Sequence, residues 1–364
     1  MKTFRLALFV VLLALLAPSH RPSAQNGVFF MALPREVLPY DVGANAFSIV
    51  GTYYEGRALA WMPTSGTSDL GGRSGHAISL DGKTIIGRAL DSRGFENAAI
   101  WQGAESWRVL GSIRPDAQDC DRLLSAAFGA SDDGKVIVGL AWDGCRIARA
   151  FRWEESTGVV DLGSTTTGRS SRANEVSGDG RIVIGWQENT EGFRQGAKWI
   201  AGRQEIIVNA AGRVAGEARA ANRDGSIIVG QNCDLYNPDT LSPELNAAWK
   251  WNASGGARCF VMERPRLLRD LPYITIMMDT SEDGRVIGGA YSFGLDSEAL
   301  IWIDDKGYFL KDYLADHGLP DVFSNWVNTG FITGVSPDGR TLVGYGAGPR
   351  AFQGYVVILP ERGK

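Results

Sequence analysis

The sequence predicts an all-β fold, a seven-bladed β-propeller made of four-stranded blades. Two observations carry this prediction: a nine-residue stretch that recurs along the chain, and a spacing of about 50 residues between most of its copies. The composition agrees with them. With 46 glycines and 11 tryptophans in 364 residues and few long apolar helical stripes, the chain is typical of many short strands joined by turns.

The recurring stretch is a polar residue, an Asp-Gly pair and an apolar run closed by glycine. SGDGRIVIG at residues 177–185 is one copy, and near copies begin at residues 79, 131, 222, 281 and 336. Asp-Gly next to an apolar run is a strong hairpin signal, because a type I′ turn needs positive φ at both central positions and Asx-Gly tolerates it. The stretch therefore predicts that two strands are joined by a type I′ turn in each unit.

A second element follows each apolar run, and in most units it ends in tryptophan, as in AFRW at Trp153 and GAKW at Trp199. The small residues that open these elements are separated by 40, 52, 46, 52, 51 and 52 residues. A third element such as VDLGS follows in most copies. Each unit thus holds four strand candidates, a to d, with the turn between a and b and the tryptophan on c, where we expect it to pack between blades. We number the units 1 to 7 along the chain.

The two ends of the repeat distinguish a propeller from a linear β-solenoid. Unit 7 stops after its third strand, AFQGYVVILP, and an additional strand candidate, GVFFMAL at residues 27–33, precedes unit 1. If that segment supplies strand d of unit 7, the ring closes and no sheet edge stays exposed. Solenoid coils are usually shorter and need capping ends, which favours the propeller.

The first 24 residues are expected to be an export signal. Lys2 and Arg5 precede an apolar core from Leu6 to Ala17, and small residues lead to an expected cleavage after Ala24. Residues 25–364 then form a single propeller domain, and no later apolar run is long enough to span a membrane. This domain holds 34 basic and 41 acidic residues, which it scatters, so a nucleic-acid-binding surface is not expected.

Four cysteines in an exported chain predict two disulfides, and three pairings are possible. Local spacing favours Cys120 with Cys145 and Cys233 with Cys259. A metal site would need closely spaced Cys or His ligands such as C-x-x-C, which are absent from the sequence. We therefore expect no metal and no cofactor.

The repeat resembles the HAF family of bacterial extracellular repeats. The shared pattern is A-x-x-x-S-x-D-G-x-x-[IV]-x-G, then A-[FLI]-x-W, then G-x-x-x-L-G, and it covers residues 27–359. Unit 1 lacks Asp-Gly, and Asn222 stands in place of one serine. The resemblance implies export and a propeller fold, but no catalytic residues.

Repetition also limits where a binding site can lie, because a feature present in every unit cannot mark one site. The a-to-b and c-to-d turns share one end of the strands, which we call the turn face; the b-to-c and d-to-a connections share the other, the loop face. Every sizeable insertion falls on the loop face, where binding sites usually lie. These insertions are residues 112–124, 231–246, 263–272 and 312–328.

Two groups of side chains are candidates for this site. The first is a set of aromatics expected to be exposed on the loop face, of which we select Trp142, Tyr236, Tyr313 and Trp326 as ligand contacts; the others are Tyr53, Tyr54, Trp186 and Tyr291. The second group lies on strand a, two to three residues before the serine of the repeat, where the polarity of the residue differs from unit to unit. Its members are His76, Asn174, Glu175, Arg219, Asp279 and Thr333.

The leading functional hypothesis is an exported, monomeric binding module for a cell-envelope glycan or protein, in the periplasm or outside the cell. The alternative is a hydrolase or lyase acting on extracellular polysaccharide, with Glu175, Asp279 and His76 as an acid/base set at the channel mouth. A third possibility is a structural envelope protein without a small ligand. From the strand a residues we select His76, Glu175, Arg219 and Asp279 as ligand-binding candidates.

Overall fold

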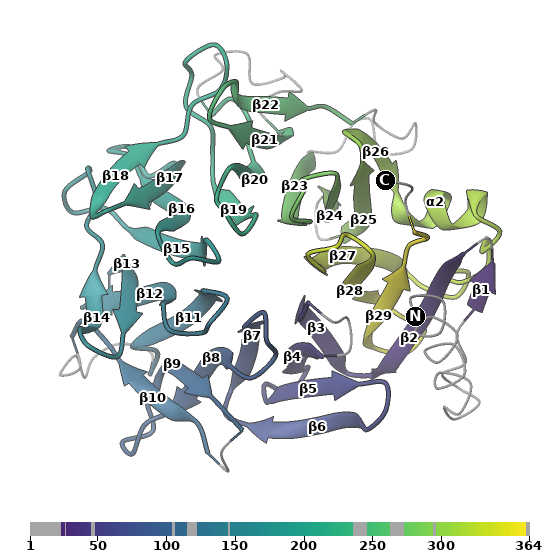
Figure 1. Ribbon diagram of the computed structural model, residues 1–364, viewed down its shortest axis with the longest axis horizontal. Helices are drawn as coiled ribbons and strands as arrows, with labels where there is room; N and C mark the ends of the chain where they lie inside the picture. The colour runs from purple at the N-terminus through teal and green to yellow at the C-terminus, as the bar shows by residue number, and fades with distance from the viewer. Residues whose placement is uncertain are drawn as a thin grey trace.

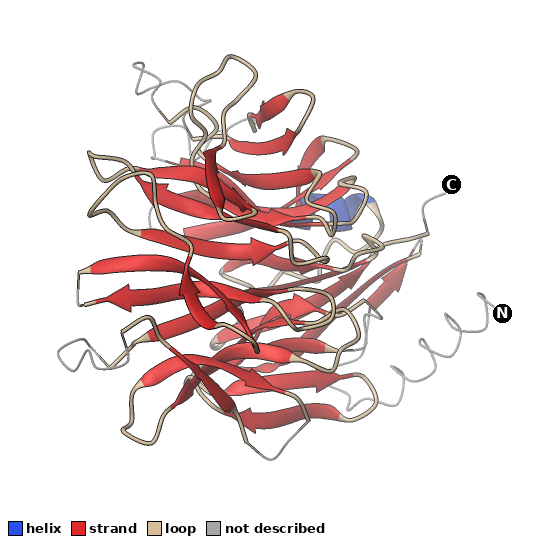
Figure 2. Cartoon of the chain, turned by 60° about the vertical axis from the view of Figure 1, so that its left-hand side comes forward, coloured by secondary structure: helices blue, strands red, loops and turns tan. Residues whose placement is uncertain are grey.

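The computed structural model describes residues 23–25, 27–44, 48–103, 106–114, 122–144, 146–235, 246–262, 273–293 and 296–361. These residues form an all-β molecule in which four-stranded antiparallel sheets are arranged around a common axis (Figure 1). The side view shows the strands of neighbouring sheets stacked in layers (Figure 2).

Units 1 to 4 each form a sheet whose strands follow chain order. Their strands are β3 (Val37–Val42), β4 (Ile49–Tyr53), β5 (Ala58–Met62) and β6 (Gly66–Gly71); β7 (Ser74–Ile78), β8 (Ile85–Leu90), β9 (Glu96–Trp101) and β10 (Arg108–Gly111); β11 (Ser125–Ala130), β12 (Ile137–Asp143), β13 (Ile147–Glu154) and β14 (Gly158–Asp161); and β15 (Ser171–Val176), β16 (Ile182–Glu188), β17 (Arg194–Ile200) and β18 (Arg203–Ile206).

Units 5 and 6 repeat this order and are linked by one bridge between Gln231 and Ile276. Their strands are β19 (Ala218–Ala221), β20 (Ile227–Gln231), β21 (Ala248–Asn252) and β22 (Gly256–Phe260), then β23 (Tyr273–Thr280), β24 (Val286–Phe293), β25 (Asp296–Ile303) and β26 (Lys306–Phe309).

Unit 7 combines both ends of the described chain. Strands β27 (Asn328–Val335), β28 (Thr341–Ala347) and β29 (Phe352–Ile358) are joined by β2 (Val28–Arg35), which pairs antiparallel with β29. A short strand, β1 (Ser23–Gln25), lies outside β2. The predicted pairing of the N-terminal strand with the last unit is therefore present.

The predicted a-to-b hairpins form, but the turn type was predicted wrongly. In unit 4, Gly180 N–H donates to the Ser177 carbonyl, so Gly178 and Asp179 are the central residues of the turn, and neither has positive φ; in the Asp179-Gly180 pair only the glycine does (+74°). A type I′ turn would need positive φ at both central residues, so it is excluded. Asp179 stabilises the turn through its side chain instead, accepting hydrogen bonds from Ser177 Oγ at 2.7 Å and from Arg181 N–H at 3.0 Å.

The core lies between neighbouring sheets. Trp199 is buried with apolar residues of units 3 and 4, and Trp153 is buried with residues of units 2 and 3. These tryptophans pack between sheets, as predicted. A hydroxyl that opens strand a also accepts an N–H from strand c of the preceding unit, as Ser171 does from Ala150 at 3.0 Å. Equivalent bonds join Ser125 to Ala98, Thr275 to Ala248 and Thr329 to Ala299.

One helix, α2 (Leu310–Asp316), was not predicted; it lies within the last insertion, on the outside of the sheets (Figure 1). Leu310, Tyr313 and Leu314 of α2 are buried against β2 and unit 7. This part of the insertion therefore completes the outer core.

Candidate functional site

The side chains around the axis come from a β-bulge that recurs in strand a of every unit. Three residues before the turn position, the register with strand b shifts by one residue. A bulge leaves one residue unpaired and redirects its side chain. All of the bulged residues line a single channel of about 470 Å³. They are Tyr40, His76, Phe128, Asn174, Arg219, Met278 and Thr333.

Each bulge faces a glycine on strand b, the same glycine that closes the repeated stretch. In unit 3, Gly139 pairs with Ala127 beside the bulge, and a Cβ on Gly139 would stand less than 3.0 Å from the Ala126 carbonyl oxygen. The equivalent clash occurs at Gly51, Gly87, Gly185, Gly230, Gly289 and Gly344. A glycine inside a strand marks a bulge or a close backbone approach. The repeated glycine was therefore a sequence signal for the bulge that we did not use.

Units 4 and 5 form a cationic wall organised around one buried carboxylate; its Arg172 and Arg219 line the channel, and Arg194 lies beside them at the start of β17. Glu217 is 1% exposed, and its oxygens lie 2.7 Å from Arg172 Nη2, 3.1 Å from Arg194 Nη1 and 3.3 Å from Arg219 Nη1. Burial would raise the pKa of Glu217, but the three guanidinium groups outweigh it and hold that pKa below its ordinary value. One carboxylate thus serves three arginines.

The arginines are held in place by aromatic faces and amides. The Arg172 guanidinium lies 5.1 Å from the Phe128 ring and 5.6 Å from the Trp186 ring, and Arg194 covers Trp186 at 4.3 Å. Arg219 donates to Gln231 Oε1 through Nε and Nη2. These contacts fix the cationic groups before any ligand arrives.

An aromatic arc, Phe331, Tyr345, Tyr40, His76 and Phe128, forms the opposite side of the channel. Consecutive ring centroids are 6.0, 6.1, 5.8 and 5.1 Å apart, and the last pair is stacked. The arc runs through units 7, 1, 2 and 3 and ends against Arg172 of unit 4. The channel therefore has one aromatic side and one cationic side.

His76 is neutral in this setting. Burial lowers the pKa of His76 to about 4, and the nearby charges of Arg88 and Arg172 act in the same direction. Its Nδ1 lies 2.7 Å from the Ala127 carbonyl oxygen, which requires a donor, so Nδ1 carries the proton and Nε2 is an acceptor. His76 therefore offers a ligand an acceptor, without positive charge.

Three acids, Asp41, Glu175 and Asp279, lie between the channel and a smaller cavity of about 110 Å³ towards the turn face. They occupy the same strand a position in units 1, 4 and 6. Burial raises the pKa of Asp41 to about 6 and that of Asp279 to about 8, and it raises the pKa of Glu175 well above its ordinary value.

Asp41 and Asp279 are bound between neighbouring units. Asp41 accepts N–H bonds from Val42 and, in unit 2, from Ile78 at 2.9 Å. Asp279 accepts them from Thr280 and, in unit 7, from Val335 at 2.6 Å. Because each carboxyl oxygen already binds a backbone donor freed near a bulge, these two acids connect adjacent sheets.

Glu175 differs from the other two acids. Its Oε1 accepts the Val176 N–H at 2.8 Å, and within the described part of the chain its Oε2 makes no hydrogen bond. Burial raises the pKa of Glu175 well above its ordinary value, and the nearby Asp41 and Asp279 act in the same direction, so its protonated form is favoured. In that form Glu175 can donate a hydrogen bond into the cavity.

An ion pair crosses the turn-face end of the smaller cavity. Arg223 of unit 5 reaches past unit 4 to Asp132 of unit 3, and its own N–H donates to Glu282 of unit 6. Unit 4 has glycine at the equivalent position because a Cβ on Gly178 would collide with the Asp132 carboxylate. Arg223, Asp132 and Glu282 thus border the smaller cavity at the turn-face end of the axis.

The structure brings four of the selected site residues together. His76, Glu175, Arg219 and Asp279 all line the channel, as do Asn174 and Thr333. We did not select their neighbours from the sequence. Some of these depart from the repeat at the same positions of strand a, others come from the other end of strand a, and Tyr345 lies on strand b of unit 7. These neighbours are Tyr40, Asp41, Phe128, Arg172, Glu217, Phe331 and Tyr345.

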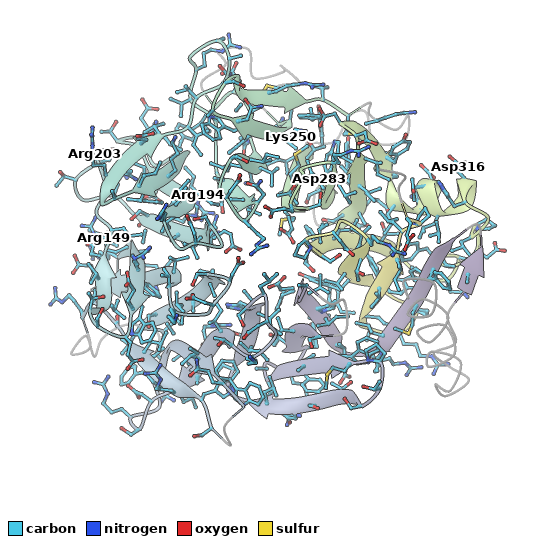
Figure 3. All side chains as sticks on the ribbon, in the orientation of Figure 1. Arg149, Arg194, Arg203, Lys250, Asp283 and Asp316 are labelled. Carbon is cyan, nitrogen blue, oxygen red and sulfur yellow. A yellow bond between two sulfur atoms is a disulfide. The ribbon has the colours of Figure 1, made fainter. Side chains whose placement is uncertain are left out.

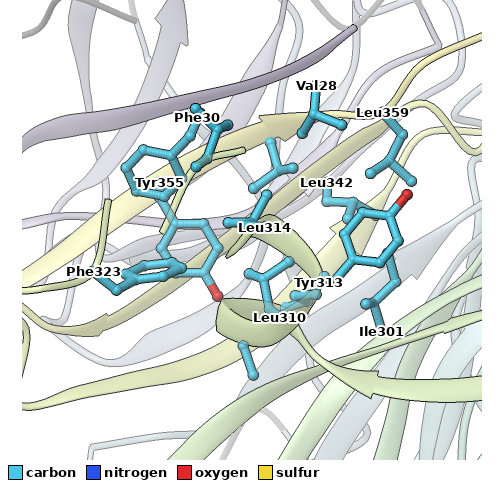
Figure 4. Close-up of a cluster of buried hydrophobic side chains, with 14 of the residues drawn as sticks. Val28, Phe30, Ile301, Leu310, Tyr313, Leu314, Phe323, Leu342, Tyr355 and Leu359 are labelled. Carbon is cyan, nitrogen blue, oxygen red and sulfur yellow. The ribbon is translucent and has the colours of Figure 1, made fainter. Parts of the chain in front are cut away.

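Trp142, Tyr313 and Trp326, three of the selected aromatics, do not line the channel. Tyr313 is 8% exposed and lies among apolar side chains of the outer core (Figure 4). Trp326 is half-buried and packs against Phe323 and Tyr355, with centroid distances of 5.2 and 5.8 Å. Trp142 is half-buried at the end of β12. Tyr236 lies outside the described residues.

The expectation of exposure was also wrong for Trp186 and Tyr291. Trp186 is buried beneath Arg172 and Arg194, and Tyr291 stacks on Tyr273 at 5.1 Å in the core. Tyr53 is half-buried. Tyr54 is 61% exposed and stacks on Phe352, beside a second cavity that shares Phe331 and Tyr345 with the channel.

The predicted Cys233–Cys259 disulfide is present, with Cα atoms 5.4 Å apart. It joins the end of the unit 5 b strand to strand d of the same unit. Cys120 and Cys145 lie outside the described residues, so their pairing remains a prediction. The insertions at residues 112–124, 231–246 and 263–272 also lie largely outside them.

Neither a metal cluster nor a membrane helix occurs among the described residues. They contain no group of three or more His, Cys, Asp or Glu side chains that could hold a metal ion. No helix in the same part of the chain is long and apolar enough to cross a bilayer.

Comparison with solved structures supports the β-propeller fold. The β-propeller domain of the Trilobed protease from Pyrococcus furiosus, described as having an open velcro topology, matches with a TM-score of 0.51 at 10% identity over 93% of this chain and 94% of that one. TolB from Acinetobacter baumannii matches with a TM-score of 0.45 at 12% identity over 78% of this chain; the chain spans 63% of that protein. No protein-family model and no curated protein matches the sequence.

Proposed function

We propose that this protein is an exported, seven-bladed β-propeller of the HAF repeat type that binds a ligand in its axial channel. In this proposal residues 1–24 direct export, and β2 closes the ring as the outermost strand of unit 7. Its pairing with β29 supports the closure, since it joins the first and last parts of the repeat in one sheet. The Cys233–Cys259 disulfide supports an oxidising compartment outside the cytoplasm.

The observation that carries the binding function is the contrast between repeated backbone and unrepeated side chains at the bulge. The backbone device is the same in every unit, yet the residue it directs into the channel is different in each. A requirement of the fold alone would favour the same residue type each time, as it does at the turns. The variation supports selection for one composite site.

The ligand enters from the loop face. The cavity at the turn-face end is much smaller and is bordered by the Arg223–Asp132 ion pair, whereas the channel volume lies within the range typical of small-molecule pockets. The partner is therefore a small molecule or the end of a longer chain, such as an envelope glycan.

A channel-filling variant tests this proposal. Met278 lies at a bulge and lines the channel, and its thioether is at most a weak acceptor, so Met278→Trp fills the cavity without breaking a strong polar contact. Purified wild-type protein would be screened on a defined array of envelope glycans, peptides and metabolites. We expect at least one ligand whose binding is lost in Met278→Trp and kept in Val160→Trp, which adds bulk at an exposed position of β14. Equal binding by both variants to every ligand would refute an axial site.

One observation favours catalysis as a second candidate. Glu175 has a pKa raised well above its ordinary value and an unused oxygen, which suits a general acid in polysaccharide cleavage. In a glycan-hydrolysis screen, this candidate predicts activity that falls about 100-fold or more in Glu175→Gln. Product release that is unchanged in Glu175→Gln would exclude the assignment.

A further inference from the structure

The cationic wall carries more positive charge than its protein partners neutralise. Arg172, Arg194 and Arg219 share the single carboxylate of Glu217, which leaves an excess of two positive charges. Glu188 lies opposite Arg194 in the strand pairing and accepts a hydrogen bond from the Ser170 N–H, but within the described residues it forms no ion pair with the three arginines. Burial disfavours a compensating negative charge on Glu175. Burial lowers the pKa of Arg172, and repulsion from the other two arginines acts in the same direction.

Two of these arginines also have N–H groups that make no hydrogen bond within the described residues. Arg172 uses Nε for Asn174 and Nη2 for Glu217, and Arg194 uses Nη1 for Glu217. In the described part of the chain, Arg172 Nη1 and Arg194 Nη2 make no hydrogen bond. Arg219 is held by Gln231 and Glu217 and contributes mainly charge. An arginine pair with unused N–H groups suits a planar anion such as a carboxylate.

The aromatic arc supplies a complementary surface for a ring. All five of its rings line the channel, and the arc ends against Arg172. Neutral His76 offers an acceptor at the channel wall, and Glu175, whose pKa is raised by burial, offers a donor in its protonated form; this pair suits hydroxyl groups. A ring that carries hydroxyls and one carboxylate would use all of these groups.

We infer that the channel binds a uronic acid unit, its carboxylate on Arg172 and Arg194 and its sugar ring against the aromatic arc. This inference rests on the proposed binding function and narrows it to acidic glycans. A ring carboxylate without hydroxyls shares the anionic contact but leaves His76 and Glu175 unused. Neutral sugars leave the excess charge of the wall uncompensated.

Calorimetric titration of the full chain with D-glucuronate, D-glucose and benzoate tests the inference. We expect glucuronate to bind about tenfold more tightly than either of the others, or better. Arg194→Gln is expected to weaken glucuronate binding by a similar factor. Arg203→Gln, an equal charge change on exposed β18, leaves it unchanged; Figure 3 shows Arg194 nearer the axis than Arg203.

A second variant separates anion binding from structural support. Glu217→Gln removes the only carboxylate of the cluster, so glucuronate should raise its Tm by more than it raises the wild-type Tm, at equal ionic strength in sodium chloride. If Glu217→Gln does not fold, the Arg194→Gln comparison still decides. Equal binding of glucose and glucuronate, or tighter binding of benzoate, overturns the inference. The proposed function is tested separately. It fails if the ligand array gives no ligand whose binding is lost in Met278→Trp.

Discussion

The turn face and the channel wall are built from the same strands but follow opposite rules. At the turns, serine Oγ donates to the aspartate in five units, over distances from 2.6 to 2.8 Å. A few residues earlier on the same strands, the bulged position holds tyrosine, histidine, phenylalanine, asparagine, arginine, methionine and threonine. The uniform residues make the local hydrogen bonds that the turn requires. The varied residues are those expected to contact a ligand in the channel.

The two regions are connected by the backbone. The bulge allows the side chains to differ because the glycine opposite it relieves the steric conflict in every unit. The repeat can therefore keep one geometry while each unit contributes a different group to the channel. Changes at the glycine should affect folding, and changes at the bulged residue should affect binding.

The largest effect is expected from Gly139→Ala. The added Cβ would meet the Ala126 carbonyl and the Phe151 ring at distances that no packed structure keeps, so strands a and b of unit 3 must separate. Overpacking of this kind costs about 3 kcal/mol or more when backbone must move. Urea denaturation of the variant measures the loss.

Gly94→Ala is the matched control for that prediction. Gly94 has φ of +84°, and a Cβ added there would meet no heavy atom within 4 Å, so only backbone strain of about 1–2 kcal/mol is expected. Equal losses of free energy of unfolding in the two variants would show that the repeated glycine is needed for its backbone conformation, and not because strand a approaches it too closely for a Cβ.

The fold was largely predictable because its signals are local. Serine, Asp-Gly and the closing glycine lie within nine residues, so one pattern located strands a and b in six units. The turn type was wrong because we assigned positive φ to the Asx residue, whereas Asp179 acts by accepting hydrogen bonds from Ser177 and Arg181. Helix α2 was missed because its three buried residues pack against β2, which is far away in the sequence.

The site was predictable only in part, because its residues meet across units. Polarity before the turn pointed to His76, Glu175, Arg219 and Asp279, which the channel brings together. The Arg172–Glu217 pair spans 45 residues, and neither residue is unusual in its own strand. Aromatic residues misled us for the same reason: Tyr313 and Tyr291 look exposed by loop position, but tertiary packing buries them.

The raised pKa of Asp279, which lies between the channel and the smaller cavity, can be tested by the pH dependence of stability. Its folded pKa of about 8 lies above the ordinary value for aspartate, so the folded state holds a proton that the unfolded chain releases. This contribution to stability is complete below about pH 4 and is lost as pH rises through about 8, with a slope of at most about 1.4 kcal/mol per pH unit. Asp279→Asn should flatten that decline in the free energy of unfolding.

The sign of the difference makes this test specific. The asparagine of the Asp279→Asn variant cannot ionise, so the variant is expected to be no more stable than wild type at about pH 5 and to become relatively more stable towards about pH 9. Glu175 and Asp41 leave a residual slope. Curves that run parallel across this range would contradict a protonated Asp279.

The smallest effect sharpens the comparison between repeated and unrepeated positions. Ser177→Ala removes a hydroxyl that donates to Asp179 and accepts from the Ile182 N–H, so we expect a loss of about 1–2 kcal/mol. Ser131→Ala breaks the same two bonds in unit 3 and should cost the same within about 0.5 kcal/mol.

Neither change reaches the channel, so ligand affinity should stay constant while Tm falls. Met278→Ala should behave in the opposite way, with affinity changed and Tm nearly kept. If the serine variants weaken binding as much as the channel variant does, the turns and the bulges are not separable, and the division between scaffold and site along strand a is wrong.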